Sequence, residues 1–118
     1  MSHPVVWFEV MGKDGKALRS FYTELFGWKI DASNPMEYGM VEASNGRGIP
    51  GGVGQVGDKP WPGVAFYVST TDINDSLERA GKLGGKTLMP RTELPGGTIL
   101  GFFADPEGHP IGLVEEAA

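Results

Sequence analysis

The residues of this sequence best suited to chemistry are two glutamates, Glu9 and Glu42, and two histidines, His3 and His109. Both glutamates fall in stretches with the composition of strands. They could act as a general acid and base, or they could be ordinary carboxylates at a solvated rim. His3 stands near the amino terminus and His109 in a turn, and a structural role is the favoured interpretation of both. The sequence has no cysteine, which removes disulfides, thiolate metal sites and cysteine nucleophiles.

The first stretch able to position such residues is a helix followed at once by a strand. Its apolar side chains recur at the spacing of one helix face: Leu18, Phe21, Tyr22, Leu25 and Phe26. Gly27 follows the last of them, where helices commonly end in a left-handed residue. Residues 28–30 then alternate apolar, polar and apolar, which is typical of a strand with one buried face. We therefore expect this apolar stripe to pack on a sheet, with Phe21 in the core.

The same order of elements is predicted twice along the chain. Helices are predicted at residues 14–26 and 72–83. Strands are predicted at residues 5–10, 28–31, 38–42, 51–56, 64–69, 86–89, 98–104 and 111–115. The two halves match at an offset of 58 residues: Pro4 with Pro62, Asp14 with Asp72, Leu25 with Leu83 and Gly27 with Gly85. This repetition indicates a single domain, residues 1–118, built from two βαβββ modules, residues 1–57 and 58–118, which meet at Gly57–Pro62.

The composition is that of one soluble globular domain, with 118 residues of which 40% are hydrophobic and 21% charged. A formal net charge of −5 disfavours nucleic acids and anionic membranes as partners, since both are bound through positive surface. No apolar run approaches the ~20 residues needed to cross a bilayer, and the first residues lack the pattern of a secretion signal. We therefore expect a cytoplasmic protein that binds neither nucleic acid nor membrane.

Two stretches of the sequence, Phe21–Trp28 and Asp105–Leu113, resemble the motifs of the vicinal oxygen chelate superfamily. That superfamily contains glyoxalase I, extradiol dioxygenases, and the bleomycin and fosfomycin resistance proteins. The resemblance covers essentially the whole chain and implies an α+β fold, the glyoxalase/bleomycin resistance/dioxygenase fold. In that fold two βαβββ modules of one chain form a curved mixed sheet, which makes a cup around a small molecule. The resemblance is less specific for activity, because one fold hosts many chemistries.

The resemblance also implies where a metal ion would stand. Metal-dependent members hold a divalent ion with histidine and glutamate at four strand positions, which here carry Trp7, Gly52, Ala65 and Gly112. None of these side chains offers the oxygen or imidazole nitrogen that such a cation needs. We therefore expect no metal ion and no other cofactor.

The lining of the implied cup follows from alternation along its strands. If Trp7 and Ala65 face the cup, then Glu9 and Tyr67 face it too, because residues two apart share a strand face. In resembling proteins the strand beside the last one contributes as well, and its residues and their counterparts in the first half complete the wall. The predicted ligand-binding residues are Trp7, Glu9, Met40, Glu42, Tyr67, Leu100 and Phe102. An aromatic wall with few polar groups suits a small-molecule site, but the same aromatics could simply be core.

Two functions remain open from the sequence. The first is a metal-free binding protein, similar to the bleomycin-resistance branch, that holds a small aromatic or cationic molecule. The alternative is a glyoxalase- or dioxygenase-like enzyme, a lyase, isomerase or oxygenase, which recruits a metal through Glu9, Glu42 and a histidine. The missing ligands favour the first function. The sequence leaves open whether the cup forms within one chain or between swapped halves of two chains. The short junction Gly57–Pro62 favours a partner chain, so a homodimer is expected.

Overall fold

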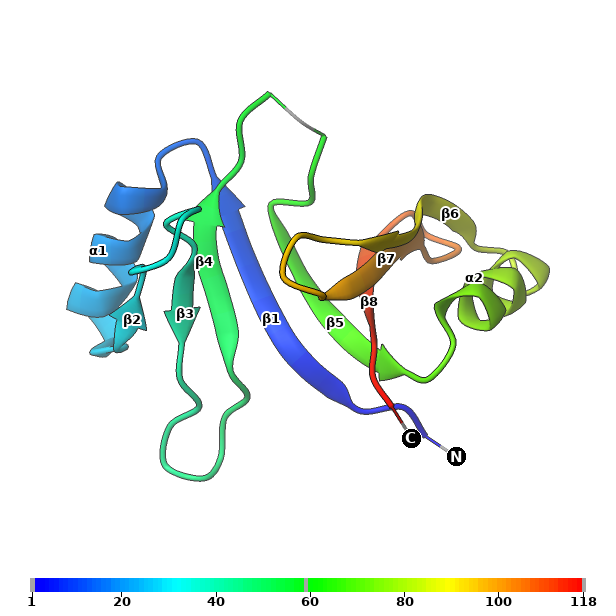
Figure 1. The fold of residues 1–118 in the computed structure, drawn as a ribbon, viewed down its shortest axis with the longest axis horizontal. Helices are drawn as coiled ribbons and strands as arrows, with labels where there is room; N and C mark the ends of the chain where they lie inside the picture. The colour runs from blue at the N-terminus through cyan, green and yellow to red at the C-terminus, as the bar shows by residue number, and fades with distance from the viewer. Residues whose placement is uncertain (1, 59, 118) are drawn as a thin grey trace. The chain divides into compact units, whose positions relative to one another are not determined.

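The computed structural model describes residues 2–58 and 60–117, and it has the α+β fold with two successive βαβββ modules (Figure 1). In chain order the elements are β1 (Val5–Gly12), α1 (Gly15–Phe26), β2 (Ile30–Asp31), β3 (Gly39–Val41), β4 (Gly51–Gln55), β5 (Val64–Thr70), α2 (Ile73–Lys82), β6 (Lys86–Glu93), β7 (Ile99–Ala104) and β8 (Pro110–Glu115). Every predicted helix and strand is present. In the described residues neither helix is long and apolar enough to cross a membrane.

The chain forms two compact units whose boundaries fall inside β1 and β5. The first unit is Trp7–Ala65, and the second unit joins Phe66 and the residues after it to the residues up to Val6. The amino-terminal segment belongs to the second unit because the amide of Ser69 donates to the carbonyl of Pro4 over 2.9 Å. Lys59, in the predicted junction, lies outside the described residues.

In the first unit the strand order is β2-β3-β4-β1, with β4 and β1 parallel and the other pairs antiparallel. Asp14 caps α1 by accepting a hydrogen bond from the amide of Ala17 over 3.0 Å. The helix ends at Gly27, whose φ of 70° is in the left-handed region that glycine adopts without strain. These local signals confirm the predicted start and end of the helix.

The apolar stripe of α1 does not pack into the core as predicted. Phe21, Leu25 and Phe26 are 55%, 58% and 57% exposed. The helix meets the sheet closely at its first turn, where a Cβ at Gly15 would meet the Gln55 side chain at 3.0 Å and a Cβ at Gly12 would meet Leu18 at 2.5 Å. Leu18 and Tyr22 of the stripe are partly buried, whereas its other three residues are exposed. The prediction that Phe21 is a core residue is therefore wrong.

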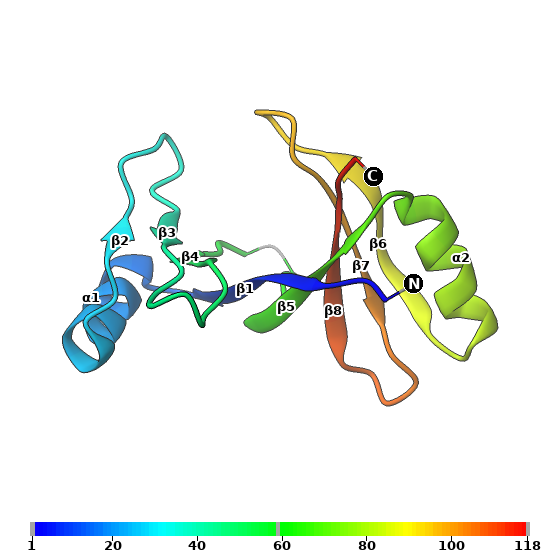
Figure 2. The same ribbon diagram turned by 90° about the horizontal axis from the view of Figure 1, so that it is seen from below.

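In the second unit the strand order is β5-β8-β7-β6, with β5 and β8 parallel and the other pairs antiparallel. Figure 2 shows α2 running beside β6. The core of this unit lies between α2 and the sheet. It contains Ile73 and Leu77 of the helix, Leu113 of β8, and the partly buried Val68, Ile99 and Phe103.

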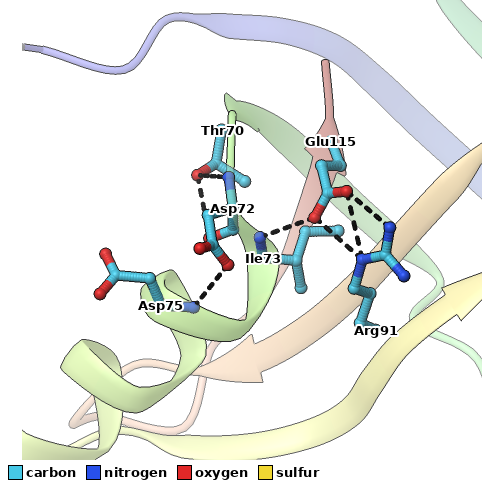
Figure 3. Close-up of polar contacts among 6 residues, drawn as sticks. All are labelled: Thr70, Asp72, Ile73, Asp75, Arg91 and Glu115. Carbon is cyan, nitrogen blue, oxygen red and sulfur yellow. Dashed lines mark hydrogen bonds and ion pairs between the residues drawn. The ribbon is translucent and has the colours of Figure 1, made fainter. Parts of the chain in front are cut away.

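Polar side chains fasten the amino-terminal end of α2 to the sheet (Figure 3). Asp72 accepts from the amide of Asp75 over 3.0 Å, and Glu115 of β8 accepts from the amide of Ile73 over 3.0 Å. The Nη2 atom of Arg91 on β6 lies 2.7 Å from the other Glu115 oxygen. Hydrogen bonds from Arg91, and then from the Ile73 amide, lower the pKa of Glu115 to about 2. Glu115 therefore stays charged and holds the helix, β6 and β8 together.

Candidate functional site

One sheet face of the first unit gathers three of the predicted wall residues. Glu9 and Met40 are both paired with Gly52, from β1 on one side and β3 on the other, so their side chains point to the same face. Trp7 is two residues before Glu9 and shares that face. Glu42 follows the end of β3 and is exposed. The predicted alternation therefore matches the strand register in this unit.

A buried hydrogen-bond network crosses this face. Glu9 is only 5% exposed, and its two oxygens accept from Tyr38 Oη and from Trp61 Nε1, each over 2.8 Å. The Nε1 atom of Trp7 donates in turn to Tyr38 Oη over 3.0 Å. Burial raises the pKa of Tyr38, and the neighbouring Glu9 carboxylate raises it further. Tyr38 thus remains a neutral donor, and Glu9 holds two aromatic side chains in place.

Sequence reasoning missed two members of this network, Tyr38 and Trp61. Tyr38 is two residues before Met40, so alternation along the strand could have identified it. Trp61 lies in the junction segment between β4 and β5, where no periodicity predicts the direction of a side chain. Its bond to Glu9 becomes visible only in three dimensions.

The second unit brings together three more of the predicted wall residues. Tyr67 and Phe102 are both paired with Gly112, and their ring centroids lie 5.4 Å apart with the planes tilted by 59°. Leu100 is two residues before Phe102 on the same strand face. All three side chains are buried. This face is opposite the one that packs against α2, where Leu113 lies.

The residues at the four metal positions of the superfamily do not fit a metal ion. A Cβ added at Gly52 would stand 1.8 Å from Tyr38 Oη, and one added at Gly112 would stand 2.4 Å from the Tyr67 ring. A tyrosine ring therefore covers each glycine, where a ligand side chain would begin. Trp7 and Ala65, at the other two positions, carry no donor for a divalent cation. Across residues 2–58 and 60–117, no three histidine, aspartate or glutamate side chains form a group able to hold a metal.

Both histidines have local structural contacts. The Nδ1 atom of His3 lies 3.1 Å from the carbonyl oxygen of Ser69. In the turn between β7 and β8, Asp105 accepts from the amides of Glu107 and His109, each over 2.9 Å, and lies 2.9 Å from His109 Nδ1. The His109 amide is the main reason that the pKa of Asp105 is lowered. These contacts agree with the favoured structural interpretation of both histidines.

Comparison with solved structures identifies the fold. A glyoxalase/bleomycin resistance protein/dioxygenase superfamily member from Vibrio splendidus matches with a TM-score of 0.66 and 15% identity, over 98% of this chain and 100% of that one. Methylmalonyl-CoA epimerase from Mycobacterium tuberculosis matches with a TM-score of 0.67 and 15% identity, over 97% of this chain and 88% of that one. The fold is therefore that of the vicinal oxygen chelate superfamily.

Sequence comparison then identifies the family within that class. The model of the glyoxalase-like domain matches residues 7–114, so the chain belongs to the glyoxalase-like domain family. A glyoxylase-like domain-containing protein from Didymella fabae is 31% identical over 108 residues, 86% of this chain and 84% of that protein. A putative glyoxylase, CFP32, from Mycobacterium bovis is 26% identical over 117 residues, 91% of this chain. The chain spans 43% of the length of that mycobacterial relative.

Proposed function

We propose that this glyoxalase-like protein is a metal-free binding protein for a small planar molecule that is aromatic or cationic. One observation carries the proposal: tyrosine rings cover both glycines at the last-strand metal positions. The ring of Tyr38 lies over Gly52, and the ring of Tyr67 lies over Gly112. The space used for metal ligands in metal-dependent relatives is thus lined by aromatic rings, which suit contact with a flat molecule.

The contact residues that we propose in the first unit are Trp7, Met40 and Glu42. Met40 is 45% exposed and Glu42 is also exposed, so both can reach a ligand. Glu9 has both oxygens engaged, and we assign it to holding Tyr38 and Trp61 rather than to contacting the ligand. A cation over the face of an aromatic ring gains about 0.5–2 kcal/mol, which supports preference for positive charge. Tyr67, Leu100 and Phe102 are buried, and we propose that they form the packed base of the wall in the second unit.

The alternative function, a metal-dependent enzyme, would need Glu9 to bind the metal. Its oxygens already accept from Tyr38 and Trp61, and the side chain is only 5% exposed, so a metal would have to enter a buried, occupied position. Metal analysis of protein purified without a chelator tests this alternative directly. A stoichiometric zinc, nickel, manganese or iron content would favour the enzyme over the binding protein.

The test of the binding function compares three planar molecules of matched size and different charge: N-methylquinolinium, quinoline and quinaldate. Each is titrated into isotopically labelled protein while the amide and indole NMR signals are followed. We expect the cation to shift the Trp7 indole signal and to bind the first unit most tightly. Glu42→Gln should lower the affinity for the cation by about three- to tenfold and leave the affinity for quinoline unchanged.

Glu93→Gln is the matched control, since it removes the same charge from an exposed position on β6. The binding proposal fails if the cation shifts no signal of Trp7 or Met40. It also fails if quinaldate binds these residues best, or if both glutamine variants weaken the cation equally.

We also propose that the chain forms a homodimer through the exposed apolar face of α1. Phe21, Leu25 and Phe26 are each more than half exposed on consecutive helix turns. Exposed apolar patches of this kind mark protein interfaces, and a two-fold axis would place the patch of one copy against the same patch of the other. Light scattering should report a dimer that Phe21→Asp converts to a monomer, with Lys29→Asp, at an exposed residue just before β2, as the control. A monomeric wild-type protein would exclude this interface.

A further inference from the structure

A cavity in the second unit lies on the opposite side of the sheet from Tyr67 and Phe102. It has a volume of about 540 Å³ and lies beneath the last turns of α2. Its floor is formed by Val68, Phe103 and Leu113, one residue from each of β5, β7 and β8. This volume lies within the range of small-molecule sites, which are usually apolar with a few polar groups.

The repeated sequence has smaller side chains in the second unit at this place than in the first. At the offset of 58 residues, Ala80 corresponds to Tyr22 and Gly84 corresponds to Phe26. In the first unit the rings of Tyr22 and Phe26 lie 5.2 Å and 5.4 Å from that of Trp28, so aromatic rings occupy the helix–strand junction. The second unit has a methyl group and a hydrogen at these positions. The second unit thus carries smaller side chains at these positions, and Ala80 is one of the residues that line the cavity.

The rim of the cavity has a cationic side chain able to pair with an anion. Arg79 is exposed on the last turn of α2 and, among the residues that the structure describes, has no carboxylate partner. Asp105 also lines the cavity, but it is engaged by two amides of its own turn and by His109. His3, which also lines the cavity, donates through Nδ1 to the carbonyl of Ser69, so its Nε2 atom is the ring nitrogen that can bind another group. Asp105 keeps its negative charge, but its hydrogen bonds hold it to its own turn, so Arg79 is the charged group of this rim that is available to a ligand.

We propose that this cavity binds a small carboxylate with an aromatic body. The ring lies against Val68, Phe103 and Leu113, and the carboxylate pairs with the guanidinium of Arg79, which is suited to planar anions. This site is separate from the proposed wall and does not depend on the proposed function. Its ligand also has the opposite charge, so the two sites are distinguished by which residues respond to which probe.

The experiment titrates cinnamate, and its neutral counterpart cinnamamide, into isotopically labelled protein. We expect cinnamate to shift the amide signals of Ala80, Leu83 and Gly85, which line the cavity. Cinnamamide should bind the same residues about three- to tenfold more weakly, the difference expected for one partly solvated ion pair. Added salt should reduce this difference, because the pair is at the rim.

Two variants test the assignment of the residues. Arg79→Gln changes an exposed side chain, so the fold should be kept. The variant should lower the affinity for cinnamate by about three- to tenfold and leave the affinity for cinnamamide unchanged. Arg47→Gln, an exposed arginine in the first unit, is the matched control and should change neither affinity. Ala80→Tyr places in α2 the residue that fills the corresponding position in α1, and it should abolish binding of both compounds.

The proposal is overturned if millimolar cinnamate leaves these amide signals in place, or if cinnamamide binds as tightly as cinnamate. It is equally overturned if Arg79→Gln and Arg47→Gln have the same effect. Unchanged binding in a folded Ala80→Tyr variant would show that the ligand lies elsewhere. If that variant does not fold, the Arg79→Gln comparison still decides the question.

Discussion

Replacing Gly52 with alanine would test whether the Tyr38 ring is fixed over β4. The new methyl carbon would stand 1.8 Å from Tyr38 Oη and 2.0 Å from Cζ, far inside the ~3.5–4.0 Å of ordinary carbon contact. The ring cannot simply swing away, because its hydroxyl donates to Glu9 and accepts from Trp7. The backbone of Tyr38 is also held, through two hydrogen bonds with the side chain of Asn34. Relief of the clash must therefore break contacts in the network.

The expected loss of stability follows from these contacts. Overpacking a well-packed position costs about 1–3 kcal/mol, and each hydrogen bond broken by the displaced ring costs about 0.5–1.5 kcal/mol. We therefore expect Gly52→Ala to lower the free energy of unfolding by about 2–5 kcal/mol. In a Tyr38→Ala background the ring is gone, and alanine has a better strand conformation than glycine. In that background Gly52→Ala should lower the free energy of unfolding by less than about 1 kcal/mol.

The assay is urea denaturation followed by circular dichroism on the two single variants and the double variant. The double-mutant cycle isolates the coupling between the two positions. Gly48→Ala is the control in the same unit, since the nearest atom to its added Cβ would be 3.8 Å away, and it should change stability by less than about 0.5 kcal/mol. The reasoning is refuted if Gly52→Ala costs no more than Gly48→Ala, or costs the same with and without the tyrosine.

Four other outcomes follow from the structure. Phe21→Ala should lower the free energy of unfolding, measured by urea denaturation of dilute protein, by less than about 1 kcal/mol, because the side chain is mostly exposed. A loss near ~3 kcal/mol would show that Phe21 is a core residue. Gly81→Ala should stabilise by about 0.5–1 kcal/mol, seen as a higher melting temperature, since the site is helical and nothing lies within 4 Å of the new Cβ. Arg91 lowers the pKa of Glu115 from 4.5 to about 2, so the stability that this carboxylate contributes is present above pH 4.5 and is lost as the pH falls toward 2. In urea denaturation, the difference in stability between the wild type and Glu115→Gln should therefore shrink across that pH range. A difference that does not change with pH would contradict this prediction. Stoichiometric zinc, nickel, manganese or iron should leave the melting temperature unchanged, whereas a concentration-dependent rise would indicate a specific site.

The order of the elements was predictable because local signals mark their ends. Asp14 and Asp72 cap the two helices through hydrogen bonds to amides three residues ahead, as expected for residues of this type. One strand, β6, extends four residues beyond its predicted end at Met89 and includes Pro90. It pairs only with β7, through an irregular register, and such an edge position tolerates a residue without an amide hydrogen. The number of partners of a strand cannot be deduced from its own sequence.

The direction of α1 was not predictable from its apolar spacing. Periodicity identifies the apolar face of a helix but does not show which face approaches the sheet most closely. Here the close contacts of the helix include Gly15, whose Cβ would meet Gln55, and Arg19, whose side chain would meet a Cβ at Gly39. Alternation along the strands, in contrast, correctly predicted that Glu9 and Met40 share one sheet face. That reasoning could not reveal that Glu9 is already bound by Trp61, from a segment without periodicity.

The two units cover their glycines by different routes. At the offset of 58 residues, Glu9 of the first unit corresponds to Tyr67 of the second. Tyr67 covers Gly112 with its own ring, whereas Glu9 covers Gly52 indirectly, by holding Tyr38 in place. Because the covering residues are not equivalent in the repeat, the two positions are independent packing solutions. A ligand side chain introduced at one glycine would therefore need the removal of its own tyrosine, and it would leave the other glycine covered. A single substitution should not recreate the metal site of metal-dependent relatives in this chain.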